Sequence, residues 1–302
     1  MLPILGGYAI VGEETDKGDG SMRDYFCGWY LKCQNGVQTV AVIAAYHIAN
    51  GEKTCSVQVI TDHGSWNVNY PWSEFRMGED RVELCGNHFG KEGFTLCLDT
   101  PQLKAEGELA FGPFDPIRYD IMGPFKYVPF MECRHSVFSM KHSVNGKLRI
   151  NGEDYVFENG VGYIEGDRGY SFPKSYVWTQ SCFPEGSVML SVADIPFCGL
   201  HFTGVISAIH YQGKEYRLGT YLGARAVYLH DGEVVVKQGR KKLTVKRLEK
   251  KGHPLAAPVG GNMTRTIHET AACRAYFHYE ENGKTVFAFE TDQSAFEYEY
   301  PQ

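Results

Sequence analysis

The 302-residue sequence predicts an all-β protein with few and short helices. First, Asn-Gly and Asp-Gly pairs recur along the chain, and such pairs adopt the positive φ angles of tight hairpins. Second, the segments between them are short and rich in β-branched and aromatic residues. Third, no segment keeps the 3.6-residue apolar period of a long helix. The turn pairs are Asn35-Gly36, Asn50-Gly51, Asn145-Gly146, Asn151-Gly152, Asn159-Gly160, Asp231-Gly232 and Asn282-Gly283.

The predicted elements follow these turns in order. Residues 101–129 carry five prolines, and we predict a loop there. The change of domain is expected after this loop, so that residues 1–155 form an N-terminal β-domain and residues 156–302 a C-terminal β-domain. The predicted strands include residues 37–48, 54–60, 94–98, 188–192, 202–211, 233–237 and 286–290.

Two segments about half a chain apart are weakly similar. Trp29-Tyr30-Leu31-Lys32-Cys33 leads past Gly36 into an apolar strand, and Trp178-Thr179-Gln180-Ser181-Cys182 leads past Gly186 into another. A repeat of this kind predicts two similar β-units in tandem, each a barrel or sandwich that closes its sheet edges. A chance match over so few positions is the alternative.

The composition is that of a globular protein with an excess of aromatic residues. Hydrophobic residues make up 43% and charged residues 22%, whereas aromatic residues reach 14%, which suits strands and apolar pockets. The formal net charge of -6 disfavours a nucleic-acid partner, because phosphate binding needs clustered lysine and arginine. In the one basic run, residues 237–251, the charges alternate with apolar residues, which indicates a solvated strand face.

Cysteine usage and hydropathy bear on the location of the protein. The nine cysteines are odd in number, widely spread and without a Cys-x-x-Cys pair. This pattern favours reduced thiols in a cytoplasmic protein over a disulfide scaffold or a thiolate zinc site. No stretch approaches the ~18 apolar residues of a membrane span, so no integral membrane segment is expected.

Four segments that follow one another along the chain carry a family resemblance. They are Asp24-Tyr25-Phe26-Cys27-Gly28-Trp29-Tyr30-Leu31-Lys32, Gly123-Pro124-Phe125-Lys126-Tyr127-Val128-Pro129-Phe130-Met131-Glu132-Cys133-Arg134-His135, the stretch 162–180, and Pro254-Leu255-Ala256-Ala257-Pro258-Val259-Gly260-Gly261-Asn262-Met263. The set resembles the tocopherol cyclase family. The resemblance implies two lipocalin-like β-domains, related in fold to carotenoid 1,2-hydratase and AttH-type proteins, with a pocket for a long apolar substrate. For the namesake activity it implies a cofactor-free, proton-initiated closure of a chromanol ring from a prenylated quinol.

The central segment supplies the first catalytic candidates. Ring closure needs a carboxylic acid that stays protonated in an apolar pocket and a base that takes the hydroxyl proton. Glu165 and Asp167, next to Tyr163, fit this requirement. Side chains alternate along a strand, so we expect both carboxylates on one face and Arg168 on the other. The alternative is a turn at Gly166 and Gly169 that Asp167 and Arg168 would close, with Asp167 bonding to the backbone.

Three further residues are predicted as catalytic. His135 could move a proton near neutral pH, although a lone histidine is more often structural. Glu132 is a candidate acid that could instead form an ion pair with Arg134 on one strand face. Asp194 follows an apolar run, where it is either a buried acid or the end of a strand.

We expect a cofactor-independent cyclase, isomerase or hydratase that acts on a hydrophobic or amphipathic small molecule. Gly166 and Arg168 stand where the family pattern has lysine and tryptophan, which favours a second hypothesis, a non-catalytic carrier of such a ligand. A structural or partner-binding β-protein with a filled interior is the third. Aromatic and polar residues are predicted to contact the substrate. They are Trp29, Tyr30, Tyr46, His47, Tyr163, Arg168, Trp178 and Gln180. The alternative is core packing for Trp29, Tyr30, Trp178 and Gln180, and a solvent-exposed strand end for Tyr46 and His47.

The sequence lacks the motifs of several other chemistries. The glycine-rich stretch 160–169 is not a strand-Gly-x-Gly-x-x-Gly-helix unit, and no Walker-type lysine motif occurs. The 11 histidines offer no clustered metal-ligand spacing, and no Gly-x-Ser-x-Gly elbow marks a serine hydrolase. We therefore predict no cofactor and no metal, and the sequence leaves the oligomeric state open.

Overall fold

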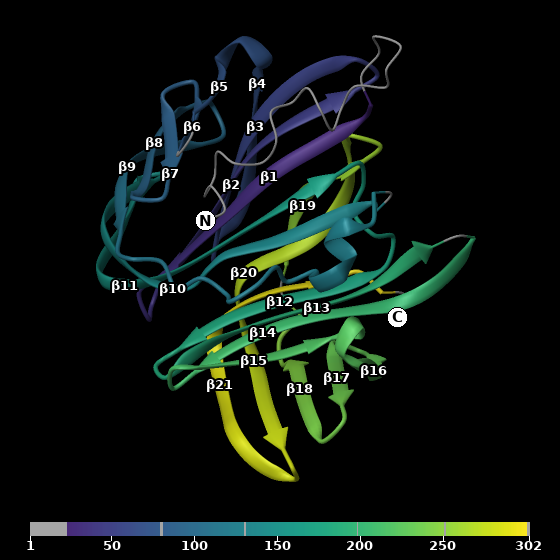
Figure 1. Ribbon diagram of the computed structural model, residues 1–302. Coiled ribbons are helices and arrows are strands. Elements are labelled where there is room, and N and C mark those ends of the chain that lie inside the picture. The colour runs from purple at the N-terminus through teal and green to yellow at the C-terminus, as the bar shows by residue number, and fades with distance from the viewer. Residues whose placement is uncertain (1–22, 79–80, 130, 198, 251, 301–302) are drawn as a thin grey trace. The chain divides into compact units, whose positions relative to one another are not determined.

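The computed structural model describes residues 23–78, 81–129, 131–197, 199–250 and 252–300. These residues form two antiparallel sheets, one 11-stranded and one 10-stranded (Figure 1). The helices among them are short 3-10 turns, so the predicted all-β class with few short helices is confirmed. Within these ranges, no helix is long and apolar enough to cross a membrane. The turns are η1 (Trp72–Glu74), η2 (Gly123–Tyr127) and η3 (Thr220–Leu222).

The first sheet runs in the order β4-β3-β2-β1-β11-β10-β9-β8-β7-β6-β5. Its first four strands form a meander, and β1 then pairs with β11, the last strand of the sheet along the chain. The strands are β1 (Tyr25–Gln34), β2 (Thr39–Ala49), β3 (Glu52–Thr61), β4 (Gly64–Pro71), β5 (Phe75–Met77), β6 (Arg81–Leu84), β7 (Asn87–Gly90), β8 (Gly93–Asp99), β9 (Lys104–Phe111), β10 (Cys133–Ile150) and β11 (Glu153–Gly169).

The second sheet runs in the order β15-β14-β13-β12-β21-β20-β18-β17-β16, with β19 paired to β20. It repeats the topology of the first sheet. Strands β12 to β15 form a meander, and β12 also pairs with β21, the last strand of the sheet along the chain. This repeat agrees with the predicted tandem of two β-units. The strands are β12 (Tyr176–Phe183), β13 (Gly186–Phe197), β14 (Leu200–Tyr211), β15 (Lys214–Gly219), β16 (Arg225–His230), β17 (Glu233–Gln238), β18 (Lys241–Arg247), β19 (His253–Val259), β20 (Asn262–Glu281) and β21 (Lys284–Tyr298).

The chain packs into two compact units, each made of separate segments. The boundary expected between residues 155 and 156 lies within β11. Because the second half of β11 pairs with β1 on one side and β10 on the other, residues 156–169 belong to the first unit. Unit 1 is Met1–Pro116, Met131–Phe172 and Leu255–Thr266, and unit 2 is Ile117–Phe130, Pro173–Pro254 and Ile267–Gln302.

Alternation along the strands gives each sheet a core face and an opposite face. In unit 1, Trp29, Tyr46 and Ile164 lie in the core. The ring centroid of Tyr46 on β2 lies 5.2 Å from that of Phe75 on β5, although these strands are far apart in the sheet order. The first sheet therefore curls around a single core. Unit 2 has a core of its own, which includes Val177, Val188, Leu190, Phe277 and Phe296.

Most of the predicted turn pairs connect consecutive strands, but two do not. Asn145-Gly146 lies within β10 and Asn159-Gly160 within β11, so the hairpins expected there are wrong. The two pairs face each other, since the backbone N–H of Asn159 donates to Oδ1 of Asn145 at 2.8 Å. The strand register shifts at Gly146, so the positive φ angles of Gly146 and Asn159 serve an irregularity of the ladder instead of a turn.

The loop predicted at residues 101–129 is partly wrong, because β9 occupies its first half. Ala105 and Leu109 of β9 are buried, whereas Glu106 and Glu108 between them are exposed. Alanine, glutamate and glycine are poor strand formers, so pairing with β8 and β10 on both sides stabilises this strand.

Two other sequence features can be located in the structure. The basic run includes β18, in which Leu243 and Val245 are buried, so the predicted strand face is confirmed. All cysteines in the described ranges are free thiols.

Candidate functional site

Tyr163, Glu165 and Asp167 lie on one face of β11, the face opposite the core, since Ile164 between them points into the core. Gly166 pairs with Trp29 in the unbroken strand, so the turn considered there does not form. We call this side of β10, β11, β1, β2 and β3 the polar face, because many of its buried side chains are polar or charged. It comprises Gly28, Tyr30, Lys32, Ile43, Ala45, His47, Ser56, Gln58, His135, Tyr163, Glu165 and Asp167.

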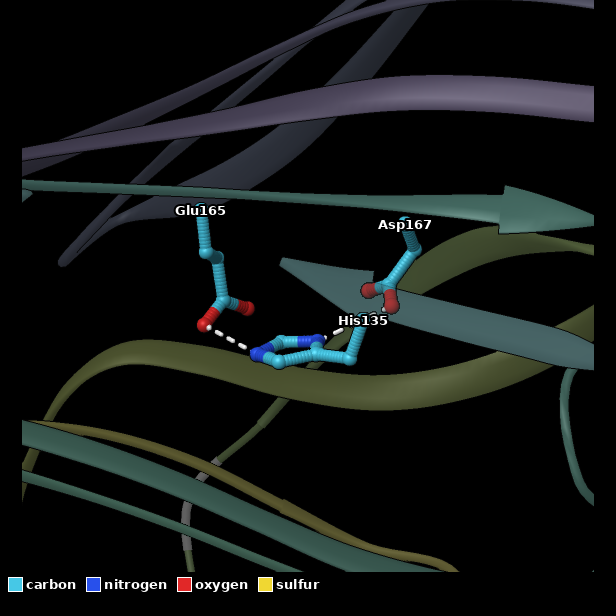
Figure 2. A group of neighbouring side chains, drawn as sticks. All are labelled: His135, Glu165 and Asp167. Atoms are coloured by element: carbon cyan, nitrogen blue, oxygen red, sulfur yellow. Dashed lines mark hydrogen bonds and ion pairs between the residues drawn. The ribbon is translucent and has the colours of Figure 1, made fainter. Parts of the chain in front are cut away.

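His135 of β10 pairs with Asp167 of β11 and lies between the two carboxylates (Figure 2). Its Nδ1 lies 2.9 Å from Oδ1 of Asp167, and its Nε2 lies 3.1 Å from Oε2 of Glu165. One imidazole therefore bridges both acids, with a ring nitrogen facing each. Strand pairing thus brings together three of the residues that the sequence predicted as catalytic.

The charge of His135 follows from two opposing effects. Burial lowers its pKa, because a buried imidazolium loses its hydration. The negative charges of Glu165 and Asp167, and hydrogen bonding to them, outweigh burial, so the pKa of His135 lies well above its ordinary value. His135 is therefore a cation at neutral pH. Its side chain and that of Glu165 are 9% and 5% exposed, whereas that of Asp167 is 24% exposed, so solvent reaches the group through Asp167.

The side chains of Cys133 and Tyr163 also bond to this group. We call Cys133, His135, Tyr163, Glu165 and Asp167 the His135 cluster. The Tyr163 hydroxyl donates a hydrogen bond to Oε2 of Glu165 at 2.5 Å. The Cys133 thiol donates to Oδ1 of Asp167 at 3.4 Å. Burial raises the pKa of this thiol well above its ordinary value, and the charge of Asp167 raises it further, so the thiol stays protonated and remains a donor.

A metal ion is an alternative ligand for the same donors. One donor atom each of His135, Glu165 and Asp167 lies within 4.8 Å of the others, and imidazole with carboxylate suits divalent metals. In the observed arrangement, however, the two ring nitrogens face different carboxylates. An ion bound by all three residues would therefore replace a proton of the imidazolium. As it stands, the arrangement is a proton network.

The substrate-binding residues predicted on β1, β2 and β11 divide between the two faces of the first sheet. Tyr30 and His47 share the polar face with Glu165, since Tyr30 is directly opposite Glu165 and His47 is opposite Phe26. Trp29 and Tyr46 pack in the core on the other side. Arg168, which is paired with the core residue Cys27, also lies on that side, as predicted.

The remaining catalytic candidates lie outside the His135 cluster. Glu132 precedes β10, and its Oε1 accepts a hydrogen bond from the Tyr170 hydroxyl at 3.1 Å. Asp194 lies within β13 of unit 2, where its Oδ2 is 2.9 Å from Nδ1 of His201. The Asp194 side chain is 37% exposed and that of His201 63% exposed, so this pair is open to solvent. The geometry gives neither Glu132 nor Asp194 a link to the imidazole of His135.

Trp178 and Gln180 lie on β12 of unit 2. They alternate with the core residue Val177 and so occupy the face of β12 that points away from the unit 2 core. Both are buried, and Nε2 of Gln180 donates to Sγ of Cys182 at 3.2 Å.

Sequence reasoning missed several residues of the polar face. Lys32 is 1% exposed and directly opposite Tyr163, and Ser56 and Gln58 on β3 are also buried. The alternation of β1 already placed Lys32 on the side of Tyr30, which was a usable signal. Nothing comparable identified Cys133, Ser56 or Gln58, because their roles depend on which strands pair.

Comparison with known proteins identifies the fold. No family model and no curated protein matches the chain. A structure of an AttH protein from Nitrosomonas europaea covers 100% of both chains, with a TM-score of 0.54 and 11% identity. Kievitone hydratase from Nectria haematococca, at 13% identity and a TM-score of 0.54, covers 98% of this chain and 94% of its own. CghA has the same coverage, with 10% identity and a TM-score of 0.57.

Similarity at these identities concerns the backbone alone. The sequence-based resemblance to the tocopherol cyclase family stays a prediction. The protein has the lipocalin-like, two-domain β-fold of the AttH protein, kievitone hydratase and CghA.

Proposed function

We propose that this protein is an enzyme that moves a proton to and from an apolar small molecule, and so hydrates, cyclises or isomerises it. One observation carries the proposal: the imidazole ring of His135 is held between the carboxyl groups of Glu165 and Asp167, and only Asp167 is open to solvent. A buried cation between two acids is costly to build and weak as a stabilising device. A group of coupled ionisable residues of which one is accessible to solvent is typical of an acid–base site.

Each residue of the cluster has a distinct part in the proposed reaction. Asp167 exchanges the proton with the substrate, because it is the accessible member. His135 is a positioning residue that holds Asp167 and stabilises its anion after the proton has left. Glu165 keeps His135 charged. The Tyr163 hydroxyl fixes the rotamer of Glu165 through its 2.5 Å hydrogen bond to Oε2.

The reaction is balanced without an oxidant or reductant. The carboxylate of Asp167 first takes a proton from solvent. The carboxyl group so formed gives this proton to one carbon of an electron-rich alkene, which leaves a carbocation on the neighbouring carbon. The oxygen of water, or of a hydroxyl group in the same molecule, then forms a bond to that carbon. Its proton returns to Asp167, so the acid is regenerated. Water gives hydration, and an internal hydroxyl gives a ring.

The similar structures support the reaction class. Kievitone hydratase is named as a hydratase, and the sequence motifs resemble the tocopherol cyclase family, whose namesake closes a ring by proton transfer. A prenylated hydroquinone carries both an alkene and a phenol, so it is the first substrate to test. Ring closure leaves its mass unchanged, whereas hydration adds the mass of one water.

Turnover of a prenylated hydroquinone, followed by liquid chromatography and mass spectrometry, tests the proposal. Loss of an acid–base residue lowers rates by ~10²–10⁴-fold, so we expect a loss of this size for Asp167→Asn. In D₂O the product should carry one deuterium on carbon. The matched control is Asp194→Asn, which removes a carboxylate with the same 2.9 Å contact to a histidine but at an exposed site.

Three outcomes would contradict the proposal. Full activity of Asp167→Asn would remove the assigned acid, and an equal loss in Asp194→Asn would show that the effect is not specific to the cluster. Recovery of the bound quinol unchanged from the wild-type protein would favour a carrier.

A further inference from the structure

A row of directly paired residues crosses the polar face from the His135 cluster to β3. His135 pairs with Asp167, Asp167 with Gly28, Gly28 with Ala45, and Ala45 with Ser56. Directly paired residues point to the same side of a sheet. Between the acidic and the hydroxyl end, the row therefore carries only a hydrogen and a methyl group. Three strand spacings separate Asp167 from Ser56, which is ~14 Å.

The row is partly open at Gly28, whereas Ala45 next to it is 3% exposed. Gly28 retains some exposure, whereas Phe26 and Tyr30 on either side of it along β1 are 3% and 8% exposed. Ile43, on the next strand, is also partly exposed. The three atoms nearest to a Cβ atom built on Gly28 belong to Ala45, Ile43 and the carbonyl of Ala44, at 3.4–3.8 Å. These are ordinary van der Waals distances, so Gly28 leaves room for at least a methyl group on this face.

The far end of the row carries buried polar atoms that lack partners. His47 is 4% exposed, and its Nε2 lies 3.1 Å from the Ser56 hydroxyl. Its Nδ1 is buried and finds no hydrogen-bond partner among the described residues. Gln58 is 2% exposed, and while its Nε2 donates to the carbonyl of Ala256 at 3.4 Å, its Oε1 has no partner within the described ranges. Buried polar groups normally have a partner, so an unpaired one indicates a ligand or a water.

The hydrogen-bond roles of these atoms follow from Ser56. In the described part of the chain, His47 is the one partner of the Ser56 hydroxyl. The hydroxyl proton needs an acceptor, so Ser56 donates to Nε2, and the imidazole proton is on Nδ1. Burial lowers the pKa of His47 to about 4, so the ring is neutral. His47 therefore offers an N–H donor, and Gln58 offers a carbonyl acceptor.

We infer that His47 and Gln58, on either side of Ser56, bind a hydroxyl group of the substrate, whose apolar body lies over the partly exposed Gly28 and Ile43. A hydroxyl group both accepts from an N–H and donates to a carbonyl, which matches the two unpaired atoms. The substrate is then a flat apolar molecule with a hydroxyl at the end remote from the reacting carbon. The inference rests on the proposed function, since it takes the His135 cluster as the reacting end.

Binding of 2-hydroxyphenanthrene and of phenanthrene, measured by fluorescence titration, tests the inference without turnover. One hydrogen bond between neutral groups is worth about tenfold in affinity. We expect His47→Phe and Gln58→Leu each to lower the affinity for the phenol by about tenfold and to leave that for the hydrocarbon unchanged. Gly28→Leu should lower both affinities, because its side chain fills the space that the ring system needs.

The control is His142→Leu. His142 is another buried histidine next to a serine hydroxyl, at 3.0 Å from Ser139, but it packs against Phe111 and Phe114 on the core side. This variant should retain both affinities. In the wild-type protein, the ¹⁵N resonance of His47 Nδ1 should shift on addition of the phenol and not of the hydrocarbon, which avoids any effect of substitution on folding.

The inference is overturned if the wild type binds both ligands equally and the His47 resonance does not move, since the two polar atoms then bind only water. It is also overturned if Gly28→Leu retains both affinities. The test separates this inference from the proposed function. Phenol binding that depends on His47, together with full turnover by Asp167→Asn, would refute the acid and leave the hydroxyl site standing.

Discussion

The pH dependence of stability gives a quantitative test of the buried histidines. Burial lowers the pKa of His142 from 6.5 to about 4, and that of His47 by the same amount. Each ring is neutral in the folded protein, whereas in the unfolded chain it binds a proton below pH 6.5. The free energy of unfolding therefore falls as the pH drops from about 6.5 towards 4. Between pH 7.5 and pH 5.0 the loss is about 2 kcal/mol for each histidine.

Substitution of His142 isolates one of these contributions. His142→Leu removes the titrating ring and keeps an apolar side chain against Phe111 and Phe114. Urea unfolding at both pH values, followed by tryptophan fluorescence, should show a loss of stability about 2 kcal/mol smaller than in the wild type. His135 acts in the opposite sense, because its pKa is raised and its stabilisation is lost as the pH rises. It is present in both proteins, so it cancels in the comparison.

A control and a contradicting result complete this experiment. Val37 is 86% exposed, belongs to the same unit and does not titrate, so Val37→Ala should leave the pH dependence unchanged. An unchanged pH dependence in His142→Leu would mean that His142 binds a proton in the folded state. The conclusion that the buried ring of His142 is neutral would then be wrong.

Two further predictions concern packing. Gly162→Ala should lower the free energy of unfolding in urea by ~1–3 kcal/mol, because its Cβ would lie 2.3 Å from Nε2 of His142. The control Gly78→Ala should leave the stability unchanged, since the nearest atom described there lies 3.7 Å from the new Cβ. Equal effects of the two substitutions would contradict the packing argument. Arg217→Met should cost ~3–5 kcal/mol and expose residues 117–129 to limited proteolysis, because the buried Arg217 binds Glu215 at 2.8 Å and donates to the carbonyl of Tyr119. Unchanged cleavage would show that this segment is held otherwise.

Local chemistry determines much of this fold. The pairs Asn50-Gly51, Asn151-Gly152 and Asn282-Gly283 form turns between strands because their positive φ angles suit any tight hairpin. The same chemistry failed at Asn145-Gly146, where the neighbouring strand continues and the irregularity is absorbed as a shift of register. The strand β9 was missed because its stability comes from two partner strands and not from its own composition.

The candidate site was predictable to a similar extent. Alternation along one strand was enough to place Glu165 and Asp167 on one face. The position of His135 between them depends on the register of β10 against β11, which no local pattern encodes. His47 was predicted as a substrate contact from its own strand. Ser56, which sets the tautomer of His47, was not predicted, because its position depends on the register of β3 against β2.

The segmented make-up of unit 1 has a consequence for synthesis of the chain on the ribosome. Residues 255–266 complete this unit, and the backbone of Phe172 and the side chain of Gln58 bond to carbonyls of that segment. The ribosome makes about three quarters of unit 2 before it reaches these residues, and residues 267–302 of that unit follow them. The polar face of the nascent first sheet therefore stays partly uncovered until residues 255–266 have been synthesised. A chain that stops before residue 255 would leave this face open to association with other chains.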